Sequence, residues 1–215
     1  MQPEAHCYTF SVVALDAATG RLGSAVASRY FAVGACVPHL QQGVGAVNTQ
    51  SEVNQYLGVE ALALMAAGAD PESAFTMVLA GDERRERRQL LAIDVHGRKA
   101  VWTGSECVDV HHHIVADTCV VAGNMLTGES VIEAMVEVME SSPDIPFGLR
   151  LIRALQAAEA EGGDKRGKQS AAVTIVPAGL DSRPPECLDL RADDAEEPVA
   201  ELARLYEKRW GKSGW

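Results

Sequence analysis

The fold is decided by residues 9–28, which have the sequence TFSVVALDAATGRLGSAVAS. The first seven of these residues are mostly apolar or β-branched, which is typical of a strand. Residues 16–20 supply turn chemistry, and a second apolar run follows over residues 22–28. This pattern predicts a β-hairpin. The small side chains of the second run indicate that another element packs closely against it.

The rest of the chain alternates between strand-like and helical segments. Asp70 followed by Pro71 is a strong signal for the start of a helix. Two helical pairs have apolar residues spaced to cover one face of a sheet. The predicted strands are 35–37, 44–49, 90–95, 99–103, 118–122, 170–176 and, at an edge, 188–190. Two predicted helices begin near residue 54 and at residue 70, and three more cover 130–140, 147–160 and 199–210. Residues 81–89 are predicted to be a solvated, charged loop.

This order of elements predicts an α+β fold of two packed antiparallel sheets with helices on both outer faces. Neither a repeat nor a linker interrupts the chain of 215 residues. We therefore expect a single domain over residues 1–215, in which 1–8 form a leader and 199–215 a C-terminal tail helix.

The charge and the cysteines exclude several classes of protein. A net charge of −11 repels phosphate backbones and anionic lipid headgroups, so we expect no nucleic-acid or membrane partner. The five cysteines include no CxxC pair, which argues against a disulfide framework and favours the reducing cytoplasm. Neither an export signal nor an apolar stretch long enough to span a membrane is visible.

Polar residues gather where the predicted strands and helices end, and such positions often carry function. Thr9 stands at the head of the first strand and is, taken alone, an ordinary strand residue. Other polar residues stand at strand ends and in the turn after the fourth helix. The members are Ser28, Arg29, Thr49, Gln50, Asn124, Asp164, Lys165, Arg166, Gln169 and Ser170.

Six stretches in this order resemble an uncharacterised family of Ntn-hydrolase-like proteins, a domain of unknown function. They are TFSVVA at 9–14, AVASRYFAVG at 25–34, GVGAV with Thr49 and Gln50 at 43–50, GNML at 123–126, GGDKRGKQSAA at 162–172 and LDLR at 188–191. They extend over nearly the whole chain. The resemblance implies a four-layer αββα sandwich, which agrees with the predicted order of elements.

The resemblance also implies a chemistry centred on Thr9. Ntn hydrolases attack an amide carbonyl with an N-terminal Thr, Ser or Cys, and the α-amine of that residue acts as the base. Residues 1–8 precede Thr9 here, so its amine exists only after the bond between Tyr8 and Thr9 is cleaved. Cys7 is an alternative nucleophile, but it is also internal.

The other site residues have a functional and a structural interpretation. Asn124 would donate its amide to a developing oxyanion, or it is a turn residue. Arg29, Lys165 and Arg166 would clamp a substrate carboxylate, or they follow the dipole of a helix end. Asp164, Gln169 and Ser170 would join the turn to the site, or they satisfy the turn's own backbone. Ser28, Thr49 and Gln50 complete the predicted substrate-binding set.

Three functions remain open at this point. The first is an Ntn-type amidohydrolase acting on a small carboxylated or peptide-like substrate, with Thr9, Asn124 and Arg29 as catalytic residues. The second is a non-catalytic small-molecule-binding protein on the same fold, and the third is a homo-oligomeric assembly protein. We expect no cofactor and no metal, because the three histidines at 111–113 alternate faces and lack a partner at ligand spacing.

Overall fold

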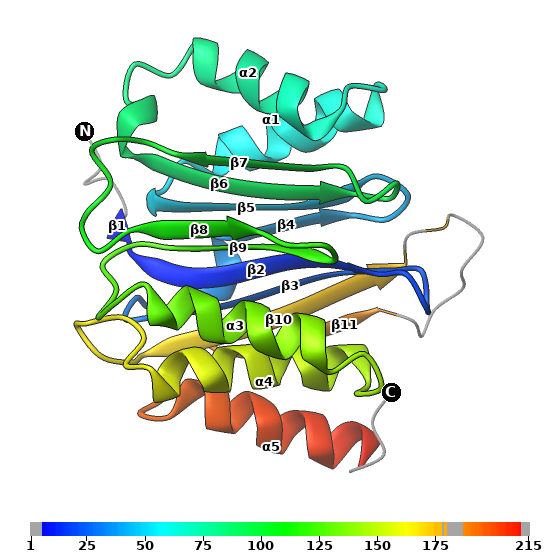
Figure 1. The fold of residues 1–215 in the computed structure, drawn as a ribbon, viewed down its shortest axis with the longest axis vertical. Coiled ribbons are helices and arrows are strands. Elements are labelled where there is room, and N and C mark those ends of the chain that lie inside the picture. Colours follow the sequence, from blue (N-terminus) through cyan, green and yellow to red (C-terminus); the bar gives the residue numbers. More distant parts are fainter. Residues whose placement is uncertain (1–5, 178, 180–186, 212–215) are drawn as a thin grey trace.

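The protein consists of two antiparallel β-sheets stacked face to face, with helices outside both sheets (Figure 1). The computed structural model describes residues 6–177, 179 and 187–211. Most of the leader, residues 1–5, and the end of the tail, residues 212–215, lie outside the described residues. The predicted α+β class and the predicted pair of antiparallel sheets are confirmed.

The first sheet is built around the predicted hairpin. β2 (Thr9–Asp16) and β3 (Arg21–Ser28) pair antiparallel with Thr9 opposite Ser28, and Gly20 closes the turn with a φ of 62°. The sheet has the order β11-β10-β3-β2-β9-β8. Its other strands are β8 (His112–Val115), β9 (Cys119–Gly123), β10 (Ser170–Pro177) and β11 (Leu188–Ala192).

The second sheet is centred on β5 (Gly45–Glu52). β6 (Arg88–Asp94) pairs along one edge of β5, and β7 (Lys99–Thr103) continues the sheet beyond β6. β4 (Pro38–Gln41) and β1 (His6–Cys7) share the opposite edge of β5, where Cys7 lies opposite Ser51. His6 and Cys7 therefore form a short strand of this sheet immediately before β2.

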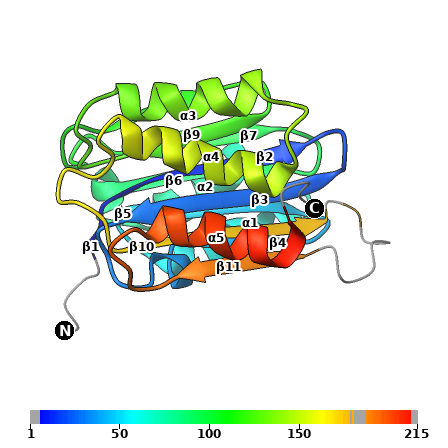
Figure 2. The same ribbon diagram turned by 90° about the horizontal axis from the view of Figure 1, so that it is seen from below.

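Helices cover each outer face. α1 (Gln55–Ala66) and α2 (Pro71–Ala80) lie on the second sheet, and α3 (Ser130–Ser141) and α4 (Phe147–Ala160) lie on the first (Figures 1 and 2). α5 (Pro198–Trp210) packs beside α4 over β10 and β11. The side chain of Asp70 accepts a hydrogen bond of 2.9 Å from the backbone N of Ser73, so the predicted helix start is confirmed.

The hairpin strands are buried on both faces, and this explains their nearly continuous apolar sequence. Successive side chains alternate across a strand. Phe10, Val12 and Ala14 face the layer of α3 and α4, whereas Val13 packs against the second sheet. Gly23 has no room for a side chain, because an added Cβ would lie 2.7 Å from side-chain atoms of Phe147 and Leu151. The predicted close packing against this strand is confirmed.

Two local predictions are wrong. The sequence predicts a strand at 35–37, but the chain makes the short 3-10 helix η1 (Val33–Ala35) and the strand begins at Pro38. The chain turns tightly here, because Ala32 has a φ of 53° and the backbone N of Ala35 donates to the carbonyl of Ala32 at 2.9 Å. Gly34 lets this turn pack on β10, since an added Cβ would lie 2.4 Å from the Cβ of Ala172. Residues 81–89 are not entirely a solvated loop, since Arg88 and Gln89 already belong to β6 and are buried.

No helix in the described part of the chain has both the length and the apolar character that crossing a membrane requires.

Candidate functional site

The candidate site lies at the end of the sandwich where β2 begins and β3, β5 and β9 end. Thr9, Ser28 and Ser170 are neighbours across three paired strands. Asn124 follows the last residue of β9, and its backbone N donates to the carbonyl of Thr9 at 2.9 Å. Antiparallel pairing thus brings together four predicted residues that lie far apart in the sequence.

The side chain of Thr9 is fully buried. Its hydroxyl donates to the carbonyl oxygen of Ala27 on the neighbouring strand. The backbone nitrogen of Thr9 is part of the peptide bond with Tyr8, which the structure contains. In the intact chain Thr9 therefore has neither a free α-amine nor a solvent-exposed hydroxyl.

The carbonyl of Tyr8 receives two side-chain hydrogen bonds. Ser28 Oγ donates to it at 2.6 Å, and Arg166 Nη2 donates at 2.8 Å. The Arg166 guanidinium also lies over the Tyr8 ring, 5.0 Å from its centroid. This carbonyl belongs to the peptide bond that must be cleaved to free Thr9. Two donors on one carbonyl oxygen polarise it in the manner of an oxyanion hole.

Arg166 is held in place by Asp164. Two hydrogen bonds of 3.0 and 2.6 Å join the guanidinium to the carboxylate, whose side chain is only 1% exposed. Such a planar, charge-assisted pair fixes the direction of the guanidinium. Asp164 also accepts the backbone N–H of Arg29 at 3.1 Å, and Arg29 Nη1 donates to the carbonyl of Arg166 at 2.6 Å. Asp164 and Arg29 therefore position Arg166.

Asn124 and Gln50 belong to a buried polar network between the two sheets. Gln89 is its centre, because its Oε1 accepts from Gln50 Nε2 at 2.7 Å and from Asn124 Nδ2 at 2.9 Å. Ser11 Oγ donates to Gln50 Oε1 at 2.6 Å. Asn124 Oδ1 is buried and has no partner among the residues that the structure describes. The amide of Asn124 thus donates to Gln89 rather than to the Tyr8 carbonyl.

The remaining predicted substrate-binding residues contact other groups. Thr49 Oγ1 lies 3.4 Å from His39 Nε2, and Lys165 Nζ donates to the carbonyl of Asp109. Gln169 Nε2 donates to Asp194 Oδ1 at 3.2 Å. The hydroxyl of Ser170 accepts from the backbone N of Val33 at 2.9 Å. These four side chains hold the surrounding loops together and do not reach the Tyr8 carbonyl.

Sequence reasoning missed the pocket that holds Cys7. The side chain is fully buried among Val33, Val37 and Cys36, and its Sγ lies 3.4 Å from Cys36 Sγ. The hydrogen bond between the two thiols, together with burial, raises the pKa of Cys7, whereas the same hydrogen bond lowers the pKa of Cys36. Cys7 is therefore a protonated, apolar anchor for the leader. No sequence signal links two cysteines 29 positions apart.

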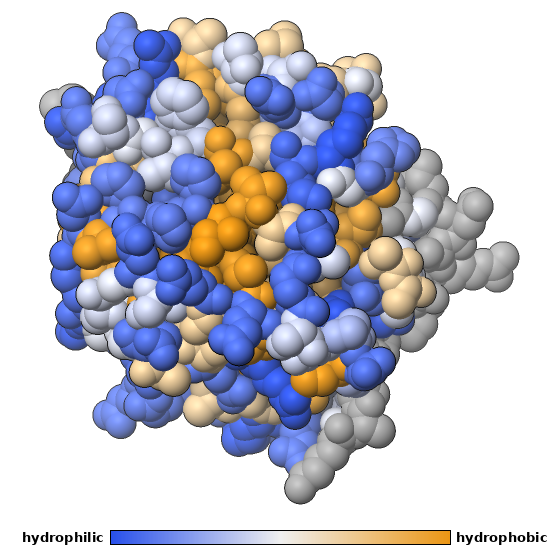
Figure 3. Space-filling view, in the orientation of Figure 1, coloured by the Kyte–Doolittle hydropathy of each residue, from blue (hydrophilic) through white to orange (hydrophobic). Residues whose placement is uncertain are grey.

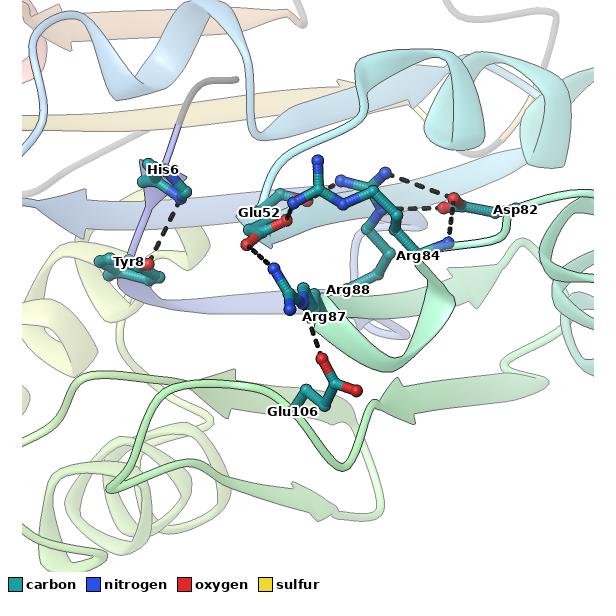
Figure 4. A network of polar contacts seen from close by, with 8 residues as sticks. All are labelled: His6, Tyr8, Glu52, Asp82, Arg84, Arg87, Arg88 and Glu106. Carbon is teal, nitrogen blue, oxygen red and sulfur yellow. Dashed lines mark hydrogen bonds and ion pairs between the residues drawn. The ribbon is translucent and has the colours of Figure 1, made fainter. Parts of the chain in front are cut away.

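An ionic cluster holds the neighbouring strand ends (Figure 4). Glu52, at the end of β5, contacts Arg84 and Arg87, and Arg88 pairs with Asp82 at 2.8 Å. Arg88 Nη1 also donates to the carbonyl of Glu52 at 2.6 Å. The arginine-rich segment thus fastens β5, the partner strand of the leader, to β6.

Backbone strain is found at the same end of the sandwich. Ser51, opposite Cys7, has a φ of 73°, and Met125, next to Asn124, has a φ of 58°. A non-glycine residue in this region costs about 1–3 kcal/mol and is often found at functional sites. In the described ranges 6–177, 179 and 187–211, no three His, Cys, Asp or Glu side chains form a group that could hold a metal ion.

The fold and this strand-end site define an α+β protein of two stacked antiparallel sheets with helices on both faces. The chain belongs to a family of unknown function, DUF1028, whose model matches residues 9–202. It is similar to a protein of that family from Silicibacter pomeroyi, with which it shares 34% sequence identity. The crystal structure of that protein matches with a TM-score of 0.86, and the match covers 96% of this chain and 91% of that one. Anbu (ancestral beta-subunit) from Yersinia bercovieri is 11% identical, with a TM-score of 0.45 and 94% of each chain covered. No curated protein matches the chain.

Proposed function

We propose that the chain is an Ntn-type amidohydrolase on a four-layer αββα sandwich, made as a precursor that cleaves its own bond between Tyr8 and Thr9. The observation that carries this proposal is the pair of donors on the Tyr8 carbonyl, Ser28 Oγ and Arg166 Nη2. They lie where negative charge develops when the Thr9 hydroxyl attacks that carbonyl. Thr9 is adjacent in the chain to the carbon that it would attack.

The self-cleavage consumes one water molecule and needs no other reactant. Thr9 Oγ1 bonds to the carbonyl carbon of Tyr8, the C–N bond to Thr9 breaks, and the hydroxyl proton passes to the new α-amine. Water then hydrolyses the ester, which leaves a carboxylate on Tyr8 and a free amine on Thr9. An α-amine has an ordinary pKa near 8, so it is suited to act as the base for Thr9 in later turnovers.

The same donors would serve the substrate after the leader leaves. Departure of Tyr8 removes the acceptor of Ser28 Oγ and of one Arg166 nitrogen, and both donors then face a carbonyl or carboxylate of the substrate. Arg29 and Asp164 keep Arg166 in position. This arrangement supports an amide bond of a small carboxylated or peptide-like molecule as the target.

N-terminal sequencing with intact mass spectrometry tests the proposal. We expect the wild-type chain to begin at Thr9 and the Thr9→Ala chain to keep its leader, because alanine has no hydroxyl to attack Tyr8. Thr174→Ala is the matched control, since it removes a threonine hydroxyl from β10 of the same sheet, away from the Tyr8 carbonyl, and it should be cleaved like the wild type. A wild-type chain that keeps residues 1–8 over several days would exclude this mechanism.

A separate observation supports assembly into a homo-oligomer. β7 and β8 are the edge strands on one side of the sandwich, and Figure 3 shows an apolar patch at the middle of this face. Trp102 of β7 and Val115 of β8 help to line a hollow of about 630 Å³, and Val115 is 49% exposed. Light scattering is expected to give a mass above the 22.9 kDa of one chain, and Val115→Arg should lower it. A monomeric mass for the wild type would contradict this assembly.

We propose that the protein acts in the cytoplasm. All five cysteines carry free thiols in the structure, which suits a reducing compartment.

A further inference from the structure

Residues 6–8 lie in the structure as an extended peptide leading into the candidate site. Cys7 pairs with Ser51 and His6 with Glu52 along the edge of β5 that β4 also uses, and Tyr8 presents its carbonyl to Ser28 and Arg166. We infer that this segment lies where the acyl side of the substrate binds during turnover. The substrates are then extended peptides with an aromatic residue before the cleaved bond and a small apolar residue before that. This inference rests on the proposed function.

Self-cleavage and turnover would share one covalent intermediate. In self-cleavage, Tyr8 becomes esterified to Thr9 Oγ1, and in turnover the acyl group of a substrate forms the same ester with the same oxygen. A substrate carbonyl must therefore reach the position of the Tyr8 carbonyl, within reach of Ser28 Oγ and Arg166 Nη2. The side chains on its acyl side then lie where Tyr8 and Cys7 lie now.

The Cys7 position selects by size. Its side chain has no exposed surface and is enclosed by Val26, Val33 and Val37, with the Cys36 thiol 3.4 Å away. The pocket that the leader vacates is thus apolar and shaped for a side chain of about the volume of Cys. Alanine fits this space, whereas a large aromatic side chain overfills it.

The Tyr8 position selects for an aromatic ring. The ring is half-buried and lies under the guanidinium of Arg166, 5.0 Å from ring centroid to Cζ, and its hydroxyl lies 3.3 Å from His6 Nδ1. A guanidinium over a ring is a favourable contact that a small side chain does not replace. Arg166 would therefore bind both the carbonyl and the side chain of the same substrate residue.

The edge of β5 selects for an extended backbone. β1 adds to this edge by antiparallel pairing, and β4 uses the same edge only as far as Asn48. Loss of the leader would leave the edge beside Ser51 and Glu52 open. A peptide that adds as a strand gains affinity from main-chain hydrogen bonds and specificity from pockets for its side chains.

Fluorogenic peptides test the inference on the processed protein. Three acetylated tripeptides with a C-terminal aminomethylcoumarin amide would be compared, namely His-Ala-Tyr, His-Trp-Tyr and His-Ala-Gly. We expect kcat/KM for His-Trp-Tyr to fall by between about 5-fold and 150-fold, since overfilling a packed site costs roughly one to three kilocalories. For His-Ala-Gly we expect a fall of about 5-fold from loss of the ring contact.

The full-length chain supplies a second readout that needs no added substrate. Cys7→Trp should slow the appearance of the Thr9 N-terminus, because tryptophan overfills the enclosed pocket. The control is Cys187→Trp, which places the same side chain at an exposed cysteine outside this pocket and should leave the rate close to that of the wild type. Circular dichroism and urea unfolding of both variants would separate slow cleavage from failure to fold.

The outcomes separate this inference from the proposed function. A wild-type chain that never begins at Thr9 removes the proposed function itself. Three results with a chain that begins at Thr9 would overturn the substrate assignment while self-cleavage stands. They are equal hydrolysis of all three peptides, preference for the Trp or the Gly peptide, and hydrolysis of none of them. Preference for His-Ala-Tyr together with slow cleavage of Cys7→Trp supports the assignment.

Discussion

Replacing Arg166 by glutamine is expected to slow cleavage between Tyr8 and Thr9 by about 10²–10³-fold, the usual effect of removing one donor from an oxyanion site. Arg166 Nη2 lies 2.8 Å from the Tyr8 carbonyl oxygen, and the fixed positive charge would stabilise the oxyanion more than the ground-state carbonyl. Mass spectrometry of freshly purified protein over time gives the fraction of chains that begin at Thr9, and its increase measures the cleavage rate.

The control for this experiment is the neighbouring residue. Lys165→Gln removes the same charge one position away, but Lys165 Nζ donates to the carbonyl of Asp109 and not to that of Tyr8. Its cleavage rate should stay close to that of the wild type. Ser28→Ala, which removes the other donor on the Tyr8 carbonyl, should slow cleavage as Arg166→Gln does. Equal rates for Arg166→Gln and Lys165→Gln would show that the Tyr8 carbonyl needs no donor from Arg166.

The parts of the fold that were predictable from the sequence depend on local chemistry. The β2–β3 hairpin follows from two apolar runs around a Gly-containing turn, and α2 begins at Asp70 and Pro71 as predicted. The strand at Pro38 was placed a few residues too early, because the packing of Gly34 against Ala172 is a contact between distant segments. Local sequence patterns carry no information about such contacts.

The same distinction holds for the site. Thr9, Ser28, Asp164 and Arg166 could be proposed from the sequence as candidate residues, because they stand at element ends in stretches that resemble a known family, and the structure brings them together. The Cys7 pocket was not predictable, since it depends on the leader pairing with β5 and on a partner cysteine 29 positions away. Nor was the role of Gln89, which looks like part of a charged loop in the sequence but joins the buried network between the sheets.

Loss of the Asp16 carboxylate is expected to lower the free energy of unfolding by about 3–5 kcal/mol, because it leaves a buried charge without its partner. Arg150 Nη2 lies 2.8 Å from Asp16 Oδ1, and the two side chains are only 8% and 10% exposed. Arg150 Nε is already buried without a partner among the described residues, and in that part of the chain Asp16 is the acceptor that the guanidinium has. Urea unfolding of Asp16→Ala measures the loss.

Two further variants separate this ion pair from other causes of instability. The double variant Asp16→Leu with Arg150→Met removes both charges and should recover most of the stability, since an apolar pair of similar volume replaces a buried ion pair at little cost. Glu201→Gln breaks the exposed pair with Arg204 and should leave the urea midpoint close to that of the wild type, because solvent screens this pair. A double variant no more stable than Asp16→Ala would show that the loss comes from the turn, where Thr19 also donates to Asp16, and not from the unpaired arginine.

Asp16 lies at the opposite end of β2 from Thr9. A folded Asp16→Ala chain should therefore still cleave between Tyr8 and Thr9. The stability of the hairpin and the cleavage at the start of β2 can then be measured separately.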